Sequence, residues 1–246
     1  MAIDVVTLNI EADKHIARWL PVVKALAPQV LCLQELFEVD CEKIGKTLGM
    51  HWVYAPTALM EKENNYRMPL KGKWGVGLFS MFPLENVIIE YYSEDSQLRV
   101  FQEPNDPRRA VIIADVVDGE KRYRIATTHF TWSPRGETTD LQRQDFARLQ
   151  PILNRYQDLI LCGDFNAPRG RELFSLFEAH YKDNVPKDIT TTIDPSLHYA
   201  GDQNLQLVVD TIFTTPEYLV KDCKVLEGLS DHKGVWAKIE KTGQSI

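Results

Sequence analysis

The sequence predicts a single α/β domain, residues 1–246, in which β-sheets are covered by helices. The length suits one large α/β domain or two small ones. About ten short apolar segments, many rich in β-branched residues and several in hairpin-like succession, alternate irregularly with three or four segments of helical period. No repeat or low-complexity linker divides the chain. This mixture favours helices packed on sheets over a strictly alternating βα chain.

The predicted helices show apolar residues at a spacing of three to four. In the first, Ile16, Trp19 and Val23 share one side, and Pro21 interrupts the pattern. Gly49 follows the second predicted helix and is expected to end it. The four expected helices span residues 14–26, 40–48, 139–153 and 171–179.

The predicted strands are bounded by turn residues such as the Asp118–Gly119 pair. They span residues 3–10, 29–35, 74–80, 86–92, 110–117, 123–130, 158–164, 207–215, 221–228 and 234–241. Residues 57–73 and 182–208 are polar and irregular, which predicts two long loops. Long loops in compact domains are often functional.

Composition narrows the class of protein. The net charge is −7 and no extended basic block occurs, which weighs against a protein that grips long duplex nucleic acid. The four cysteines form no C-x-x-C pair, and Cys32 and Cys162 lie in apolar runs as small buried residues. No stretch resembles a signal peptide or a membrane span. We therefore expect a cytoplasmic protein with reduced thiols, no membrane span and no obligate protein partner.

Polar residues recur where the apolar strands stop. Taken singly, such a residue is more often a turn former or a packed histidine than a catalytic group. Together they suggest one site, because Asp164 and Asn166 stand two positions apart and can address one ligand. The set comprises Asn9, Glu35, His129, Asp164, Asn166, Asp210, Asp231 and His232.

These residue types fit hydrolysis of a phosphate ester. Glu35 and Asp231 add hard oxygen donors, which suit Mg²⁺ or Mn²⁺ rather than zinc. The two histidines titrate near neutral pH. A metal ion can stabilise charge on phosphoryl oxygens, a carboxylate can position water, and an imidazolium can bear the developing charge.

The sequence resembles the endonuclease/exonuclease/phosphatase superfamily, which includes deoxyribonucleases, AP endonucleases and inositol-polyphosphate phosphatases. The motifs that carry the resemblance occur in the family's order and span nearly the whole chain. They are "LNI" (8–10), "LQE" (33–35), "GVGLFS" (75–80), "TTHF" (127–130), "GDFNAP" (163–168), "VDTIF" (209–213) and "SDH" (230–232). The resemblance implies a four-layer α/β sandwich of two packed mixed β-sheets flanked by helices, with the site at one end.

The resemblance also implies roles for the metal site. Glu35 would be the principal Mg²⁺ ligand, with Mn²⁺ as a substitute, and Asn9 and Asp231 would complete or support the metal site. Asp164 would orient or deprotonate the attacking water, and Asn166 would hold a phosphate oxygen.

The remaining roles concern the phosphate and the leaving group. His232, oriented by Asp210, would contact the phosphate, and His129 would stabilise or protonate the leaving group. Nuclease relatives pair this histidine with a glutamate on an earlier strand. Here the comparable stretch, "KWGVGLF", contains no acid, so His129 is expected to lack that partner.

Two further residues are candidate substrate contacts. Arg109 opens a predicted strand and is either a solvated edge residue or a contact to a phosphate oxygen. Trp132 follows His129 and either packs its loop or stacks on a nucleobase.

The leading interpretation is a Mg²⁺-dependent phosphodiesterase or nuclease, an enzyme that hydrolyses phosphoric esters by metal-assisted attack of water. Its substrate would be a nucleic acid or a small phosphate ester. Two alternatives stay open. One is a phosphomonoesterase acting on a small soluble or lipid head-group phosphate, and the other is an inactive binding module on the same fold.

Overall fold

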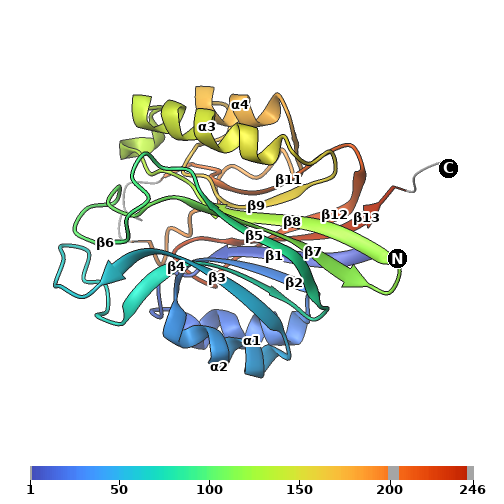
Figure 1. Cartoon of the computed structure of the whole chain (residues 1–246), viewed down its shortest axis with the longest axis horizontal. Coiled ribbons are helices and arrows are strands. Elements are labelled where there is room, and N and C mark those ends of the chain that lie inside the picture. Colours follow the sequence, from blue (N-terminus) through green and yellow to red (C-terminus); the bar gives the residue numbers. More distant parts are fainter. Residues whose placement is uncertain (1, 199–204, 243–246) are drawn as a thin grey trace.

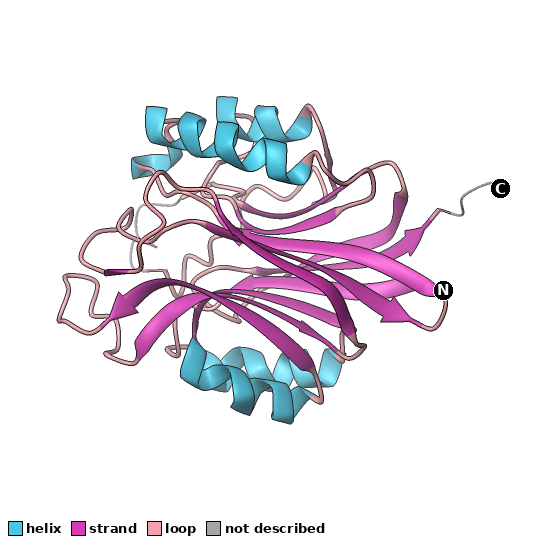
Figure 2. Cartoon of the chain, in the orientation of Figure 1, coloured by secondary structure: helices cyan, strands magenta, loops and turns pink. Residues whose placement is uncertain are grey.

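The computed structural model describes residues 2–198 and 205–242. Two mixed β-sheets pack face to face, and a pair of helices covers the outer face of each (Figures 1 and 2). The predicted four-layer sandwich is therefore confirmed. Among the described residues, no helix is long and apolar enough to cross a membrane.

The first sheet has seven strands in the described part of the chain. In spatial order they are β12 (Tyr218–Leu226), β13 (Gly234–Lys241), β1 (Ala2–Asn9), β2 (Val30–Phe37), β4 (Gly72–Ser80), β3 (His51–Met60) and β6 (Arg99–Val100). Its outer face carries α1 (Ile16–Leu26) and α2 (Glu38–Leu48). Trp19 and Val23 of α1 and Ile44 of α2 are fully buried in one cluster with Leu31 and Leu33 of β2. Burial of each such side chain contributes about 1.5–3 kcal/mol.

The second sheet has six strands in the same described residues. In spatial order they are β10 (Lys182–Asp183), β11 (Asp210–Thr214), β9 (Ile160–Asp164), β8 (Lys121–His129), β7 (Ala110–Asp118) and β5 (Leu84–Tyr91). The helices α3 (Asp140–Leu153) and α4 (Glu172–Glu178) lie on its outer face. Phe177 of α4 stacks on Phe213 of β11, with ring centroids 5.7 Å apart. A 3₁₀ turn at Pro134–Gly136 precedes α3.

The inner faces of the two sheets form the central core. It includes Ile3, Val30 and Val235 from the first sheet and Ile125 and Ile160 from the second. Cys32 and Cys162 are fully buried in this core, as predicted, and all four cysteines are free thiols.

The helix predictions are correct to within two residues at each end. Gly49 ends α2 with a left-handed backbone (φ 68°), a conformation that glycine adopts without strain. At the start of α3, Thr139 accepts a hydrogen bond from the Gln142 amide, and the Gln142 side chain accepts one from the Thr139 amide. This capping box satisfies two N–H groups that the helix itself leaves unpaired. Pro21 lies inside α1.

One prediction needs correction, because residues 57–73 are not all loop. Residues 57–60 complete β3, residues 72–73 begin β4, and the connection is residues 61–71. The strand β3 was missed because its sequence, "HWVYAPTALM", contains a proline. The register shifts between Pro56 and Ala58, so a bulge accommodates the residue that cannot donate to the ladder.

The second predicted loop begins with the two-residue strand β10, and residues 199–204 of it lie outside the described residues.

Candidate active site

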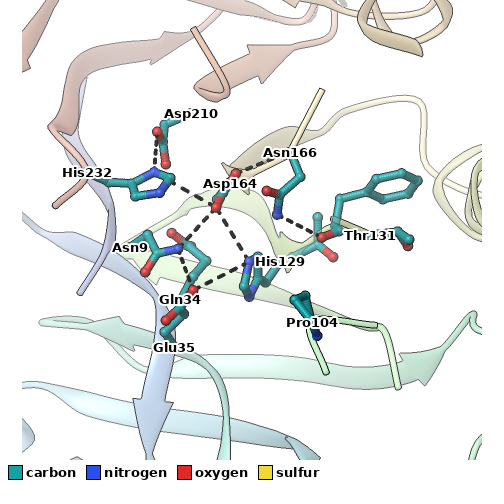
Figure 3. A network of polar contacts seen from close by, with 12 residues as sticks. Asn9, Gln34, Glu35, Pro104, His129, Thr131, Asp164, Asn166, Asp210 and His232 are labelled. Carbon is teal, nitrogen blue, oxygen red and sulfur yellow. Dashed lines mark hydrogen bonds and ion pairs between the residues drawn. The ribbon is translucent and has the colours of Figure 1, made fainter. Parts of the chain in front are cut away.

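The strand topology brings the polar strand ends together at one end of the sandwich. The pairs β1·β2 and β8·β9 are parallel, so their carboxyl ends share an edge. The strand β11 runs antiparallel to β9 and starts at that edge, with Asp210 opposite Asp164. The strand β13 runs antiparallel to β1, which places the preceding residues 230–232 there too. Figure 3 shows the resulting cluster.

Asn9 links two of the carboxylates. Its Nδ2 donates to Glu35 Oε1 and to Asp164 Oδ2, at 3.1 Å each. Its Oδ1 accepts the backbone N–H of Glu11 at 3.2 Å. In this arrangement the Asn9 side chain bridges carboxylates from both sheets.

Glu35 projects from an irregularity in β2. The pairing of β2 with β4 shifts between Leu33 and Leu36, and Glu35 has a left-handed backbone (φ 61°). This conformation is costly for a residue with a side chain, and such strain collects at functional sites. Just before it, Gln34 is fully buried and donates to Thr127 Oγ1 of β8 at 3.2 Å, which ties the two sheets together beneath the site.

The strands β8 and β9 deliver His129 and Asp164 as directly paired residues. His129 Nε2 lies 3.5 Å from Asp164 Oδ2 and 3.9 Å from Glu35 Oε1. The strand β4 supplies no acid to this histidine. Instead the Trp74 ring packs against it, with centroids 5.8 Å apart. The carboxylates next to His129 are therefore those of Asp164 and Glu35, which belong to the site itself.

His232 and Asp210 form the second histidine–carboxylate contact. Nδ1 of His232 lies 2.8 Å from Asp210 Oδ2 and 3.9 Å from Asp164 Oδ2. Burial would lower the pKa of His232, but the Asp210 and Asp164 carboxylates outweigh it and raise that pKa well above its usual value. The imidazole is therefore protonated at neutral pH.

Asp164 itself is 1% exposed. Burial would raise its pKa, but His232, then His129, and the backbone N–H of Asn166 together bring the pKa below its usual value. The carboxylate is therefore ionised at neutral pH, held among hydrogen-bond donors.

Asn166 folds back onto this cluster. Its backbone N–H donates to Asp164 Oδ1 at 2.8 Å, and its Nδ2 donates to the Phe130 carbonyl at 3.1 Å. Gln142 of α3 donates to the Asn166 carbonyl at 3.1 Å. These bonds hold a left-handed backbone at Asn166 (φ 47°).

Asp231 is 6% exposed, and one of its oxygens accepts a hydrogen bond from Ser230 at 3.0 Å. Burial raises the pKa of Asp231 to about 7, against the lowering effect of His232, and the carboxylates of Glu11 and Glu35 raise it further. A bound cation would relieve this crowding of negative charge.

The residues present fit a hard divalent cation. Glu35 Oε2 and the second oxygen of Asp231 have no hydrogen-bond partner among the described residues. Carboxylate oxygens of this kind are the ligands that Mg²⁺ and Mn²⁺ prefer. Glu35 and Asp231 would hold such an ion, and Asn9 would orient Glu35.

The structure does not bring Arg109 and Trp132 into the cluster. Ala110 faces the inter-sheet core, so the preceding Arg109 points to the helix side of the second sheet. Arg109 is 3% exposed, which rules out a solvated edge residue. It donates to the Pro104 carbonyl and lines a cavity of about 160 Å³. Trp132 is half-buried in the loop after β8.

Two residues near the site were not singled out from the sequence. Glu11 follows Asn9 by two positions, and Lys14 and His15 both contact its carboxylate. His198 lies in the predicted long loop, and its ring centroid is 6.3 Å from that of His232. Burial, then His232, lowers the pKa of His198 to about 4. The predicted loop 182–208 included His198, whereas no prediction pointed to Glu11.

A protein-family model and solved structures match this chain. The model of the Endonuclease/Exonuclease/phosphatase family matches residues 6–232. Among curated proteins, none matches. An endonuclease/exonuclease/phosphatase from Bacteroides vulgatus is 16% identical with a TM-score of 0.72, covering 98% of this chain and 100% of that chain.

Two other solved structures share the fold. ANGEL2, a 2′,3′-cyclic phosphatase, is 14% identical with a TM-score of 0.71, covering 97% of this chain and 95% of that one. The 3′-5′ exonuclease NExo from Neisseria meningitidis is 22% identical with a TM-score of 0.65, covering 98% of this chain and 100% of that one. With the family model matched over most of its length, the chain belongs to the endonuclease/exonuclease/phosphatase family, a family of phosphoesterases.

Proposed function

We propose that this protein is a Mg²⁺-dependent phosphoesterase, with Mn²⁺ as a substitute, that hydrolyses a phosphodiester by attack of water. One observation carries the proposal. The buried Asp164 carboxylate has Asn9 Nδ2 at 3.1 Å, His129 Nε2 at 3.5 Å and His232 Nδ1 at 3.9 Å. An ionised carboxylate among these donors is suited to orient water and accept its proton.

His232 is the proposed contact to the phosphoryl group. The Asp210 carboxylate contacts Nδ1 of His232. The other ring nitrogen of His232, Nε2, can then donate to a phosphoryl oxygen. The charged imidazolium stabilises negative charge that develops on that oxygen as water attacks. Asp210 is a positioning residue, because it acts through His232.

Glu35 and Asp231 would bind the metal, and Asn9 would hold Glu35 in place. When bound, the ion supplies positive charge that offsets the negative charge on the phosphoryl oxygens.

His129 is proposed to serve the leaving group, since its Nε2 faces the same carboxylates from the other side of Asp164. Asn166 is proposed to hold a phosphate oxygen with the second hydrogen of its Nδ2. Arg109 and Trp132 are proposed to contact the substrate outside the reacting centre.

The substrate class proposed is a nucleotide-containing ester, and a small one. Two proteins of the same fold have related activities. ANGEL2 is a 2′,3′-cyclic phosphatase, and NExo is a 3′-5′ exonuclease. The lysines nearest the site in sequence are neutralised: Lys14 pairs with Glu11 and Lys233 with Glu227. With a net charge of −7, the protein offers little attraction to a long polyanion. The same observation favours the second candidate, a phosphomonoesterase on a small phosphate.

Hydrolysis of bis(p-nitrophenyl) phosphate, with p-nitrophenyl phosphate compared in parallel, tests this function. We expect Mg²⁺-dependent cleavage of the diester that EDTA abolishes and that Mg²⁺ or Mn²⁺ restores. Full activity in EDTA contradicts the metal assignment. Preference for the monoester selects the second candidate, and no cleavage of either ester, or of a panel of single-stranded DNA, RNA and inositol phosphates, supports an inactive module. A cytoplasmic location is part of the proposal, supported by the four free thiols.

A further inference from the structure

Two strands from opposite sheets bring the Trp74 ring against His129. Along β4, Val76 and Leu78 face the central core between the sheets, and Trp74, two positions before Val76, lies on the same face. On β8, Ile125 faces that core, and His129 follows on the same face at the end of the strand. The ring centroids of Trp74 and His129 lie 5.8 Å apart, and the ring planes are inclined at 67°. Edge-to-face contacts of this kind are a favoured geometry for aromatic rings.

The carboxylates near His129 attract its imidazole but fix its ring plane only weakly. Nε2 of His129 lies 3.5 Å from Asp164 Oδ2 and 3.9 Å from Glu35 Oε1. A well-formed N–H···O hydrogen bond is about 2.7–3.2 Å long, so both contacts are long. The Trp74 ring packs against the imidazole and therefore limits the orientations that it can adopt, because closely packed side chains keep to single rotamers.

Packing also holds Trp74 itself in place. The residue is 4% exposed and belongs to one buried cluster with Phe37, Met60 and Phe101, and the ring centroid of Phe101 is 5.9 Å from that of Trp74. Its Nε1 is buried and has no hydrogen-bond partner among the described residues. The indole is therefore positioned by its shape and its apolar neighbours, and it can act as a wall for the imidazole.

The backbone at Trp74 is fixed by the bulge in β3. The pairing of β3 with β4 shifts around Thr57, whose Oγ1 donates to the Trp74 carbonyl at 3.1 Å. A Cβ on the next residue of β4, Gly75, would lie 2.0 Å from a backbone oxygen of β3, so the two strands approach closely there. Bulges next to active sites often re-aim a side chain. The bulge in β3 and the aromatic contact thus form one arrangement that ends at His129.

We propose that Trp74 is a positioning residue for His129, whose imidazole it holds in the orientation that serves the leaving group. The proposal deepens the proposed function and rests on it, because His129 was assigned there to the leaving group. When water attacks, the bond from phosphorus to the leaving oxygen breaks, and that oxygen gains negative charge that an N–H of the imidazole can offset. A misplacement of about 1 Å can cost about 10²-fold in rate, so loss of the Trp74 ring should be felt in the chemical step.

A double-variant cycle on a series of aryl methyl phosphates tests this role. The leaving phenols range from p-nitrophenol, a good leaving group, to unsubstituted phenol, a poor one that needs more help from His129. We expect Trp74→Leu to lower kcat about tenfold or more for the phenyl ester, to change it little for the p-nitrophenyl ester, and to leave KM nearly unchanged. In a His129→Ala background, Trp74→Leu should cause little further loss, because it acts through the imidazole.

Three variants serve as controls. Trp74→Phe retains a ring beside the imidazole and should keep most of the wild-type kcat. Trp19→Leu removes another buried indole without a partner for its Nε1, from α1 on the outer face of the first sheet, and should lower the Tm without changing the dependence on the leaving phenol. If Trp74→Leu does not fold, Trp74→Met replaces it in the cycle, since a flexible methionine fills irregular space.

The outcomes separate this proposal from the proposed function. If Trp74→Leu lowers kcat equally for every ester, equally in the His129→Ala background, or not at all, Trp74 is not a positioning residue while the proposed function stands. If His129→Ala is no worse for the phenyl ester than for the p-nitrophenyl ester, His129 does not serve the leaving group and the proposal is overturned. If the wild-type protein hydrolyses none of these esters with Mg²⁺, the proposed function fails, and the role of Trp74 fails with it.

Discussion

Asp164 connects the parts of the site that come from the two sheets, because its carboxylate contacts residues of both. Asn9 reaches it from the first sheet, His129 from the neighbouring strand of the second sheet, and His232 from the loop before β13. Because the two imidazoles and the Asn166 N–H offset the effect of burial, the pKa of Asp164 is lowered. We propose that a carboxylate placed and charged in this way orients or deprotonates the attacking water.

If Asp164 and His232 serve one transition state, their substitutions should not multiply. His232→Ala should lower kcat at least ~10²-fold, the lower end of the effect of a positioned acid–base group. The double variant with Asp164→Asn should lose far less than the product of the two single losses, because groups that act as a unit are non-additive. Steady-state kinetics on the diester measure all four corners of the cycle. Strictly multiplying losses would assign the residues to separate steps.

A substitution at Arg109 tests whether a residue outside the cluster contacts the substrate. Its Nη2 donates to the Pro104 carbonyl at 2.8 Å and to Asn105 Oδ1 at 2.9 Å, and no carboxylate lies within ion-pair distance of it among the described residues. If its remaining donors grip substrate, Arg109→Lys should raise KM several-fold, up to about tenfold for ~1.4 kcal/mol. Arg108→Lys, which alters another arginine lining the same cavity, is the matched control. Unchanged kinetics with a lowered Tm would make Arg109 purely structural.

At the scale of elements, the site depends on how closely β8 and β9 approach. A Cβ on Gly163 would lie 2.1 Å from the Thr128 carbonyl oxygen, so a side chain there cannot be accommodated without moving a strand that carries His129. The shift in the pairing of β2 with β4 at Glu35 is a second feature on which the site depends. Neither feature is periodic, so hydrophobic patterns in the sequence do not encode it.

Gly163→Ala should therefore destabilise the protein and lower its activity. We expect a loss of about 1–3 kcal/mol or more in the free energy of unfolding, as for overpacking of a tight interior. Gly119→Ala is the control, because Gly119 also has a positive φ (60°, against 153° at Gly163) but has open space around its Cβ position. Urea unfolding of both variants measures the difference. Equal losses would show that backbone strain, and not the strand contact, sets the cost.

At the scale of the whole molecule, the sequence predicted the features that depend on residues close together in the chain. The polar strand ends "GDFN" and "SDH" are visible in the sequence, and the family resemblance implied that they meet at one end of the sandwich. The strand β3 escaped because Pro56 sits in a bulge that only the folded sheet reveals. The placement of His198 depends on Asp194 bridging two loops, and that of Arg109 on which face of β7 it occupies, so both needed the tertiary structure.

Metal binding should couple to the stability of the whole fold. A ligand that binds only the native state raises stability by about 2.7 kcal/mol at one hundred times its Kd. We expect Mg²⁺ to raise the Tm of the wild-type protein, and Glu35→Gln to abolish most of that rise while changing the Tm in EDTA little. Glu38→Gln, at a nearby glutamate paired with Lys73, is the control. A full Mg²⁺-induced rise in Glu35→Gln would remove Glu35 from the metal site.

We propose that the Asp164 carboxylate, at the end of β9, performs the chemistry of phosphodiester hydrolysis. The most direct measurement is the kcat of Asp164→Asn on bis(p-nitrophenyl) phosphate at saturating Mg²⁺, beside Glu42→Gln, which changes an exposed carboxylate on α2. Asparagine preserves the shape of the side chain but cannot accept the proton. We expect Asp164→Asn to lose at least ~10²-fold in kcat with its fold and metal binding intact, and Glu42→Gln to keep the wild-type rate. A wild-type rate in Asp164→Asn would show that this carboxylate does not perform the chemistry.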